Sequence, residues 1–158
     1  MRRKKKKALV IYYTKTGHTE TAAEAVARGL ESGKAEVTVR ELLSVDPEEL
    51  REYSIIAVGS PTRGGKPARK VKKFLKGLGK KSLKGKQASV FSAYAGFRGR
   101  KTLKRMRKLL KRKKAKVGPR GVAVKAGAPL SLWKGPDLRE KDIKRLEELG
   151  KALAKKAR

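Results

Sequence analysis

Five short apolar stretches alternate along the chain with longer amphipathic segments. The apolar stretches start at residues 8, 37, 55, 88 and 122, and each is short enough to be a buried strand. Between and after them, apolar residues recur at helical spacing. The four clearest stripes are Ala22, Ala23, Val26, Ala27 and Leu30; Val71, Phe74, Leu75 and Leu78; Leu103, Met106, Leu109 and Leu110; and Ile143, Leu146, Leu149 and Leu153. Such alternation predicts a parallel sheet with helices on both faces.

Capping residues predict where several helices begin. Asp46 and Pro47 have the character of an N-cap and a first-turn proline, so a helix is expected to follow them. Pro67 is expected to open the next helix. Asp137 forms a capping-box pattern with Glu140 and is expected to precede the last one.

The order of these elements predicts a fold class. Five strands and roughly five helices alternate in a single domain that spans residues 1–158, with a basic N-terminal overhang at residues 1–7. We therefore expect an α/β doubly wound, five-stranded parallel sheet with strand order 2-1-3-4-5. In such sheets ligands bind at the carboxyl ends of the strands, where the strand order reverses. The loops after the first, third and fourth strands should converge there.

The loop after the first strand has the chemistry of a phosphate-monoester site. The hydroxyls of Thr14, Thr16 and Thr19 can donate hydrogen bonds, and Gly17 lets the backbone approach a ligand. The amides and dipole at the start of the following helix favour an anion. The chain contains neither G-x-x-x-x-G-K-[ST] nor G-x-G-x-x-G, so triphosphate and dinucleotide loops do not fit. The alternative is that threonine and glycine only make a strand-to-helix turn.

The other two loops suit a flat ligand. Residues 59–67 read GSPTRGGKP after the third strand, and residues 92–100 read SAYAGFRGR after the fourth. Both loops are long for this architecture and rich in glycine, which allows close backbone approach to a ring.

Taken together, the three loops resemble those of the flavodoxin family. The Thr-x-Thr-Gly-x-Thr loop is similar to the one that holds the phosphate of FMN in that family. The Gly-Ser-Pro-Thr and Gly-Gly-x-Pro segments resemble its second flavin loop, and an aromatic residue in the position of Tyr94 often stacks on the isoalloxazine ring. The closing segment, residues 128–136, extends the similarity. The resemblance implies a flavodoxin-like fold that binds FMN noncovalently and transfers one or two electrons at a time.

The resemblance also implies which residues would hold FMN. Those expected at the phosphate are Thr14, Lys15, Thr16, Gly17, His18 and Thr19; on one side of the ring, Pro61, Thr62, Arg63 and Gly64; on the other, Ser92, Ala93, Tyr94, Gly96 and Phe97. The second loop has no aromatic residue, so Tyr94 is the expected stacking partner, with Phe97 or Trp133 as substitutes. Losing one such partner forfeits on the order of 1 kcal/mol. His18 is expected to face solvent in its loop, with a hydrogen bond to the phosphate as the alternative.

Charge changes this picture. The formal net charge is +31, from 45 Lys and Arg against 14 acidic residues, and no Asp or Glu lies between Glu52 and Asp137. Flavodoxins tend to be acidic, so the pattern predicts an engineered, positively supercharged surface on an intact core; a natural polyanion-binding variant is the alternative. Such a field attracts RNA, DNA and anionic surfaces without sequence preference. Aromatic residues are not interleaved with the basic runs, so no base-stacking platform is expected.

The composition excludes several other kinds of site and of protein. The absence of cysteine excludes disulfides, thiolate metal sites and cysteine nucleophiles, and a single histidine argues against zinc chemistry. No apolar run reaches transmembrane length, and the basic start leads into a strand too short for a signal peptide, so a cytoplasmic protein is expected. We also expect it to be a monomer. A response-regulator receiver is excluded because the first and third strands end in Tyr13-Thr14 and Gly59-Ser60 rather than in acids.

Three functions remain open. The first is an FMN-binding electron carrier with a cationic surface and an unidentified redox partner. The second is a flavin-free scaffold that binds polyanions such as nucleic acid. The third is a flavin-dependent oxidoreductase of the quinone or protoporphyrinogen type. An electron carrier is expected over an enzyme with its own substrate, because such oxidoreductases often need extra loop elements or a substrate pocket, and the sequence identifies neither. No catalytic triad or paired-carboxylate arrangement is evident, so hydrolysis is not supported.

Overall fold

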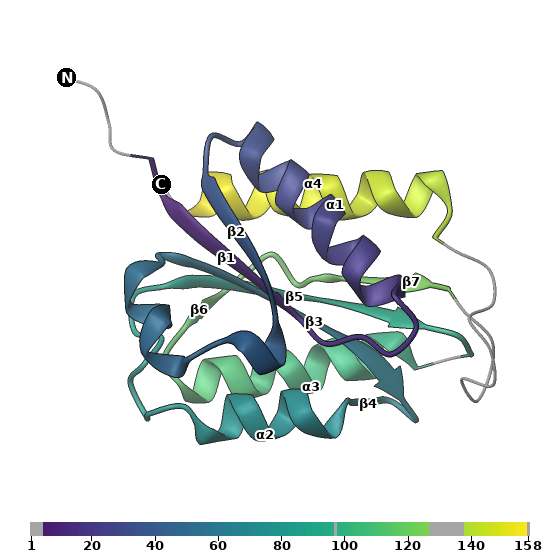
Figure 1. The fold of residues 1–158 in the computed structure, drawn as a ribbon, viewed down its shortest axis with the longest axis horizontal. Helices are drawn as coiled ribbons and strands as arrows, with labels where there is room; N and C mark the ends of the chain where they lie inside the picture. Colours follow the sequence, from purple (N-terminus) through teal and green to yellow (C-terminus); the bar gives the residue numbers. More distant parts are fainter. Residues whose placement is uncertain (1–4, 97, 127–137, 158) are drawn as a thin grey trace.

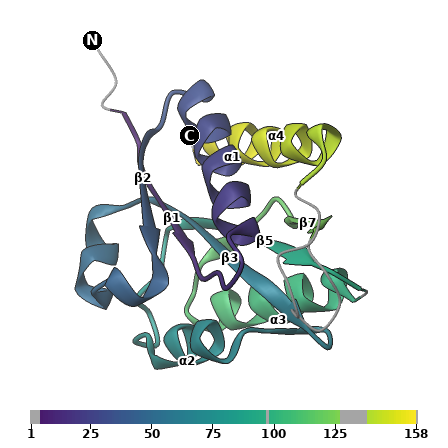
Figure 2. The ribbon, with the colours of Figure 1, turned by 45° about the vertical axis from the view of Figure 1, so that its right-hand side comes forward.

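A three-layer α/β architecture organises the chain. The computed structural model describes residues 5–96, 98–126 and 138–157. The central sheet is covered by α1 (His18–Ser32) and α4 (Glu140–Lys156) on one face and by α2 (Arg69–Gly77) and α3 (Gly99–Arg112) on the other (Figure 1). The same layers are seen after a 45° turn (Figure 2).

The sheet confirms the predicted class and strand order. Its order is β2-β1-β3-β5-β6, with β7 also paired to β5, and every one of these neighbouring pairs is parallel. The strands are β1 (Lys7–Tyr12), β2 (Glu36–Glu41), β3 (Ile55–Arg63), β5 (Gln87–Tyr94), β6 (Lys116–Val117) and β7 (Val122–Lys125). The expected fifth strand is thus two short strands, β6 and β7. Between them, the side chains of Gln87 and Ser89 donate to the carbonyls of Gly118 and Pro119, at 2.7 and 2.6 Å.

Each face of the sheet has its own apolar core. The α2–α3 side is filled by large aliphatic residues such as Leu75, Met106 and Leu110. The α1–α4 side contains many alanines, and there the two helices approach closely. A Cβ placed on Gly29 would lie 1.9 Å from the carbonyl oxygen of Glu147, and one on Gly150 would lie 2.2 Å from that of Val26. The two helix backbones are therefore in direct contact.

The structure corrects several predicted helix boundaries. Pro67 does not open a helix: it belongs to β4 (Lys66–Pro67), which pairs antiparallel with the end of β3, and α2 begins at Arg69. The reason is that β3 continues past Gly59 and turns back on itself. Helix α4 begins at Glu140 with Arg139 as its N-cap, and Asp137, the expected capping residue, lies outside the described residues.

Two further differences are smaller. The helix expected after Asp46 is a 3-10 helix, η2 (Pro47–Glu52), although the capping box of Asp46 with Glu49 is formed. A second 3-10 helix, η1 (Leu42–Ser44), precedes it, so the described residues contain four α-helices rather than about five. Lys7, which the expected overhang of residues 1–7 included, belongs to β1.

Candidate functional site

The carboxyl ends of β1, β3 and β5 meet at one edge of the sheet. Tyr12 pairs with Gly59, and Gly59 pairs with Phe91. Just beyond, the Tyr13 amide donates to the Gly59 carbonyl at 3.2 Å. Because the three strands are parallel neighbours, the loops that follow them leave from the same edge, although β3 and β5 continue past the end of β1.

The first loop makes a tight turn into α1. The Gly17 amide donates to the Thr14 hydroxyl oxygen at 2.9 Å, and the Thr21 hydroxyl donates to the Gly17 carbonyl at 3.1 Å. Gly17 has a φ of 92°, in the left-handed region that favours glycine, and it is the N-cap of α1. It carries no side-chain oxygen to cap the helix, so the start of α1 is open to an external anion.

His18 and Thr19 are placed differently from the other loop residues. Lys15 is exposed and Thr16 is half-buried, but His18 is only 4% exposed and Thr19 only 2%. The expectation of a solvent-facing His18 is therefore wrong. Helix α1 begins at His18, immediately after the Gly17 turn, and both side chains fall on its buried side.

The second loop is a hairpin rather than an open loop. Arg63 pairs with Lys66, and Gly64 and Gly65 between them both have positive φ, 57° and 80°. This is the pattern of a two-residue type I′ turn. A Cβ on Gly65 would lie 3.3 Å from the Arg98 side chain, so the hairpin tip contacts the segment that leads into α3.

The hydroxyls of Ser92 and Thr62 join the ends of β5 and β3. Ser92 donates to the Ser60 carbonyl at 2.6 Å, and its oxygen lies 2.7 Å from that of Thr62. Since the single proton of Ser92 is already donated, Thr62 is the donor in that pair. Ser60 also accepts the Ala68 amide at 2.8 Å. Ser92 is fully buried, so its bonds with Thr62 and Ser60 stabilise the sheet edge from within the protein.

The third loop begins at Tyr94, the last residue of β5. Its ring lies against the start of α3, because a Cβ on Gly99 would be 2.5 Å from the Tyr94 ring. Tyr94 is half-buried and borders a cavity of about 740 Å³ that five arginines also line. These are Arg98, Arg100, Arg107, Arg120 and Arg145. Burial and the neighbouring Arg120 lower the pKa of Arg107.

Exposed backbone is present in all three loops. A Cβ on Gly17, Gly64 or Gly96 would have no atom within 4 Å, so the backbone beside each glycine borders open space. A phosphate could approach the start of α1 and a flat ring the other two loops. These observations fit a phosphorylated aromatic ligand.

The structure brings most of the predicted site residues to this edge. Pro61 and Ala93 are paired in neighbouring strands, Ala93 is buried, and Arg63 is exposed. Phe97 and Trp133 lie outside the described residues. The hydroxyl network and the arginine-lined cavity were not predicted. The sequence did contain a signal for the cavity, because Arg120 precedes β7 and Arg145 follows it.

Other site types have no support here. Within residues 5–96, 98–126 and 138–157, no group of three His, Cys, Asp or Glu residues is placed to hold a metal ion. Among the helices described, none has the length and hydropathy to cross a membrane.

Comparison with known proteins indicates the family of this fold and site. A family model described as Flavodoxin matches residues 10–132. The structure is similar to that of a flavodoxin from the domain Archaea, with 27% identity, a TM-score of 0.80, and coverage of 96% of this chain and 98% of that one. A flavodoxin of Streptococcus pneumoniae TIGR4 is also similar, with 27% identity, a TM-score of 0.74, and coverage of 95% and 99%.

The curated relatives match this chain over only part of their length. A protein of Paracoccus denitrificans named NAD(P)H dehydrogenase (quinone) is 36% identical over an alignment that covers 54% of this chain and 52% of that protein. One of Rhizobium meliloti with the same activity in its name is 33% identical, over 55% and 52%. The chain thus spans about half the length of the curated relatives it matches.

Proposed function

Because the chain belongs to the flavodoxin family, which implies a flavin cofactor, we propose that it binds FMN and transfers electrons between partner proteins. The observation that carries the proposal is the convergence of three glycine-containing loops, one of them at the start of α1, on a single sheet edge. FMN is the flavin of choice because a single phosphate suits the Thr14–Thr19 turn.

Each loop has its own role in the proposal. Thr14, Lys15, Thr16, Gly17, His18 and Thr19 form the phosphate loop. The Thr14 oxygen already accepts the Gly17 amide, so its proton can be donated to a phosphate oxygen. Pro61, Thr62, Arg63 and Gly64 would border one side of the ring, and Ser92, Ala93, Tyr94, Gly96 and Phe97 the other. Bound FMN would supply the one- and two-electron chemistry, while the bonds of the Ser92 hydroxyl with Thr62 and with the Ser60 carbonyl hold the two ring loops together.

An FMN titration tests this function. Protein freed of polyanions would be titrated with FMN at high salt, with flavin absorbance and fluorescence recorded. We expect stoichiometric quenching and a shifted flavin band. Absence of binding by protein with a folded circular-dichroism spectrum would contradict the proposal.

The curated relatives favour a second candidate, a quinone oxidoreductase. It is supported by their 36% and 33% identity, and both are named NAD(P)H dehydrogenase (quinone). The discriminating assay is steady-state oxidation of NADH or NADPH by a quinone in the presence of FMN-loaded protein. Catalytic turnover would favour the oxidoreductase, and reduction only through a partner reductase would favour the electron carrier.

We attribute the cationic surface to design, and we infer that the protein is a monomer that attracts polyanions without sequence preference. The support is that acids are absent from residues 53–136 while both apolar cores are complete. Asp142, the one buried acid among the described residues, makes two ion pairs, with Arg139 at 3.0 Å and Arg145 at 3.2 Å. We therefore infer that basic residues were introduced at surface positions, while the buried positions kept the residues that the fold needs.

A further inference from the structure

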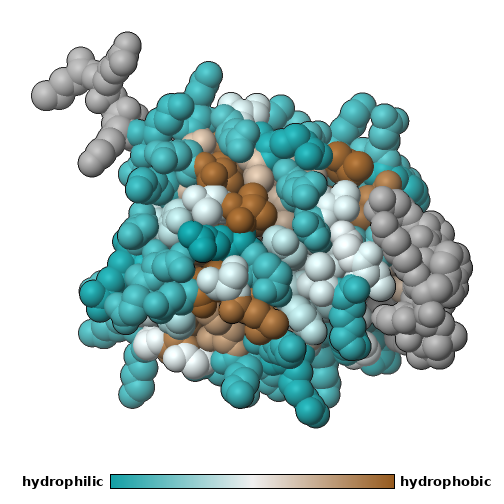
Figure 3. Space-filling model, viewed as in Figure 1, coloured by the Kyte–Doolittle hydropathy of each residue, from teal (hydrophilic) through white to brown (hydrophobic). Residues whose placement is uncertain are grey.

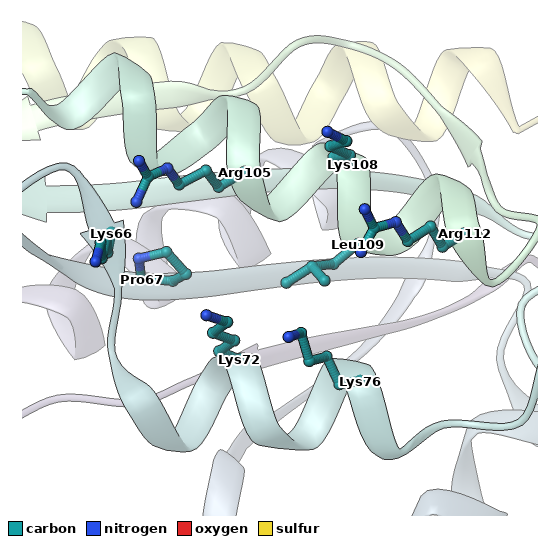
Figure 4. Close-up of a pocket in the computed structure, with 8 residues that line it drawn as sticks. All are labelled: Lys66, Pro67, Lys72, Lys76, Arg105, Lys108, Leu109 and Arg112. Carbon is teal, nitrogen blue, oxygen red and sulfur yellow. The ribbon is translucent and has the colours of Figure 1, made fainter.

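A groove runs between α2 and α3, on the face of the sheet opposite α1 and α4. It has a volume of about 240 Å³. Six cationic side chains line it, above the apolar Pro67 and Leu109. They are Lys66, Lys72, Lys76, Arg105, Lys108 and Arg112. Lys72 and Lys76 point from α2 toward α3, and Arg105 and Arg112 extend from the opposite wall (Figure 4).

The positive charge of this groove is not compensated within the protein. Neither α2 nor α3 contains an acidic residue. Among the described residues, none of the six side chains makes an ion pair, and all six residues are exposed. Like charges one helical turn apart repel one another. A ligand with several closely spaced negative charges would remove that repulsion.

The groove is held at both ends. At one end the Lys113 ammonium donates to the carbonyls of Lys76 and Leu78, at 2.9 and 2.6 Å, and so ties the end of α2 to the end of α3. At the other end the β3–β4 hairpin packs on α3, where a Cβ on Gly65 would lie 3.4 Å from Lys101. The two helices that carry the rows of cations are therefore held at a fixed separation before any ligand binds.

The geometry selects a narrow, linear anion. Lys72 and Lys76 are about 6 Å apart along the axis of α2, and Arg105 and Arg112 about 10 Å apart along that of α3. No aromatic or amide side chain lines the groove, so a nucleobase would find no aromatic ring to stack on and no amide to pair with adenine. A chain of linked phosphate groups carries several negative charges along one line, which suits the two facing rows of cations.

We propose that the α2–α3 groove is a binding site for a linear oligophosphate, a chain of three or more linked phosphates. The site is separate from the flavin edge, since it is formed by the outer surfaces of α2 and α3 together with Lys66. Inorganic polyphosphate and the phosphate chain of a nucleoside triphosphate share this chemistry.

The test is calorimetric titration of the full chain with inorganic tripolyphosphate at about 0.15 M salt, where longer-range attraction is screened. The groove variant replaces Lys66, Lys72, Lys76 and Lys108 with glutamine. The matched control replaces four exposed lysines elsewhere, Lys84, Lys141, Lys144 and Lys155, with glutamine. Both variants lose the same net charge. We expect one-to-one binding that weakens by about 30-fold or more in the groove variant and by less than about threefold in the control.

Each other outcome is informative. Equal losses in the two variants would overturn the proposal, because binding would then follow net charge alone. Displacement of tripolyphosphate by FMN would also overturn it, since the phosphates would then occupy the flavin loop. If a thymidine oligonucleotide bound in the groove more tightly than tripolyphosphate, the oligophosphate proposal would be overturned in favour of a nucleic-acid strand as the ligand. ATP in place of tripolyphosphate identifies the source: tighter binding of ATP indicates a nucleotide, and equal or weaker binding indicates inorganic polyphosphate.

Discussion

At the residue scale, the Thr14–Gly17 turn determines whether the edge can receive a phosphate. Gly17 adopts a left-handed backbone that a side chain would strain, and its amide is held by the Thr14 hydroxyl at 2.9 Å. The sequence was sufficient to propose this turn as a phosphate site, because that proposal depends on residue types only a few positions apart, but the Thr14–Gly17 bond itself was not predicted.

We predict that Thr14→Val weakens FMN binding by about tenfold, the usual effect of losing one or two hydrogen bonds of this kind. Valine has nearly the same shape but neither accepts the Gly17 amide nor donates to a phosphate. The dissociation constant from fluorescence quenching is the measurement. Thr38→Val, in β2 and away from the three loops, is the control and should bind as the unmodified chain does. Equal affinities for the two variants would argue against a phosphate role for Thr14.

Other residue-scale features were beyond reach of the sequence. The Ser92 hydroxyl bonds the Thr62 hydroxyl and the Ser60 carbonyl, which lie 30 and 32 positions earlier in the chain, and these bonds form only because β3 and β5 pair in one register. The burial of His18 likewise depends on the helix starting immediately after Gly17. Neither property follows from local pattern.

At the scale of elements, the contact between α1 and α4 rests on two glycines. Gly29 and Gly150 let the backbones touch, and Figures 1 and 2 both show these helices side by side. The order and type of the main helices and strands were predictable, because short apolar runs indicate strands and apolar residues at helical spacing indicate helices. The β3–β4 hairpin was missed, although its Gly64-Gly65 pair is a known two-residue turn signal.

We predict that Gly150→Ala lowers the free energy of unfolding by about 1–3 kcal/mol, because the new methyl would overpack against the Val26 carbonyl. Gly77→Ala is the matched control. Gly77 is also helical, but a Cβ there meets no atom within 4 Å, so alanine should be neutral or slightly stabilising. Chemical denaturation of both variants checks the difference. If both were equally tolerated, the helices could not be in backbone contact.

At the scale of the whole molecule, repulsion among the cations opposes folding. The net charge is +31, and hydrophilic residues cover most of the face in Figure 3, with apolar residues only in small groups. The six described ion pairs all involve the few acids at either end of the chain, at positions up to 49 and from 142 on. Net charge of this size is visible in the sequence, but the α2–α3 groove is not, because it depends on how two helices face each other.

We predict that the melting temperature rises with sodium chloride concentration, because salt screens like charges that cost a few tenths of a kcal/mol per helical pair. The groove variant, with four fewer positive charges, should melt higher than the unmodified chain at low salt and approach it at high salt. Differential scanning calorimetry at several salt concentrations is the measurement. A melting temperature that does not change with salt would show that the surface charge is energetically unimportant.

The most direct test of the central claim, a flavin site at the edge formed by β1, β3 and β5, is an amide nitrogen–proton correlation spectrum recorded with and without FMN at high salt. We expect the largest shifts at the amides of residues 14–19, 63–65 and 94–96, with saturation at one FMN per chain. Shifts confined to α2 and α3, or no shifts in a folded spectrum, would contradict the account.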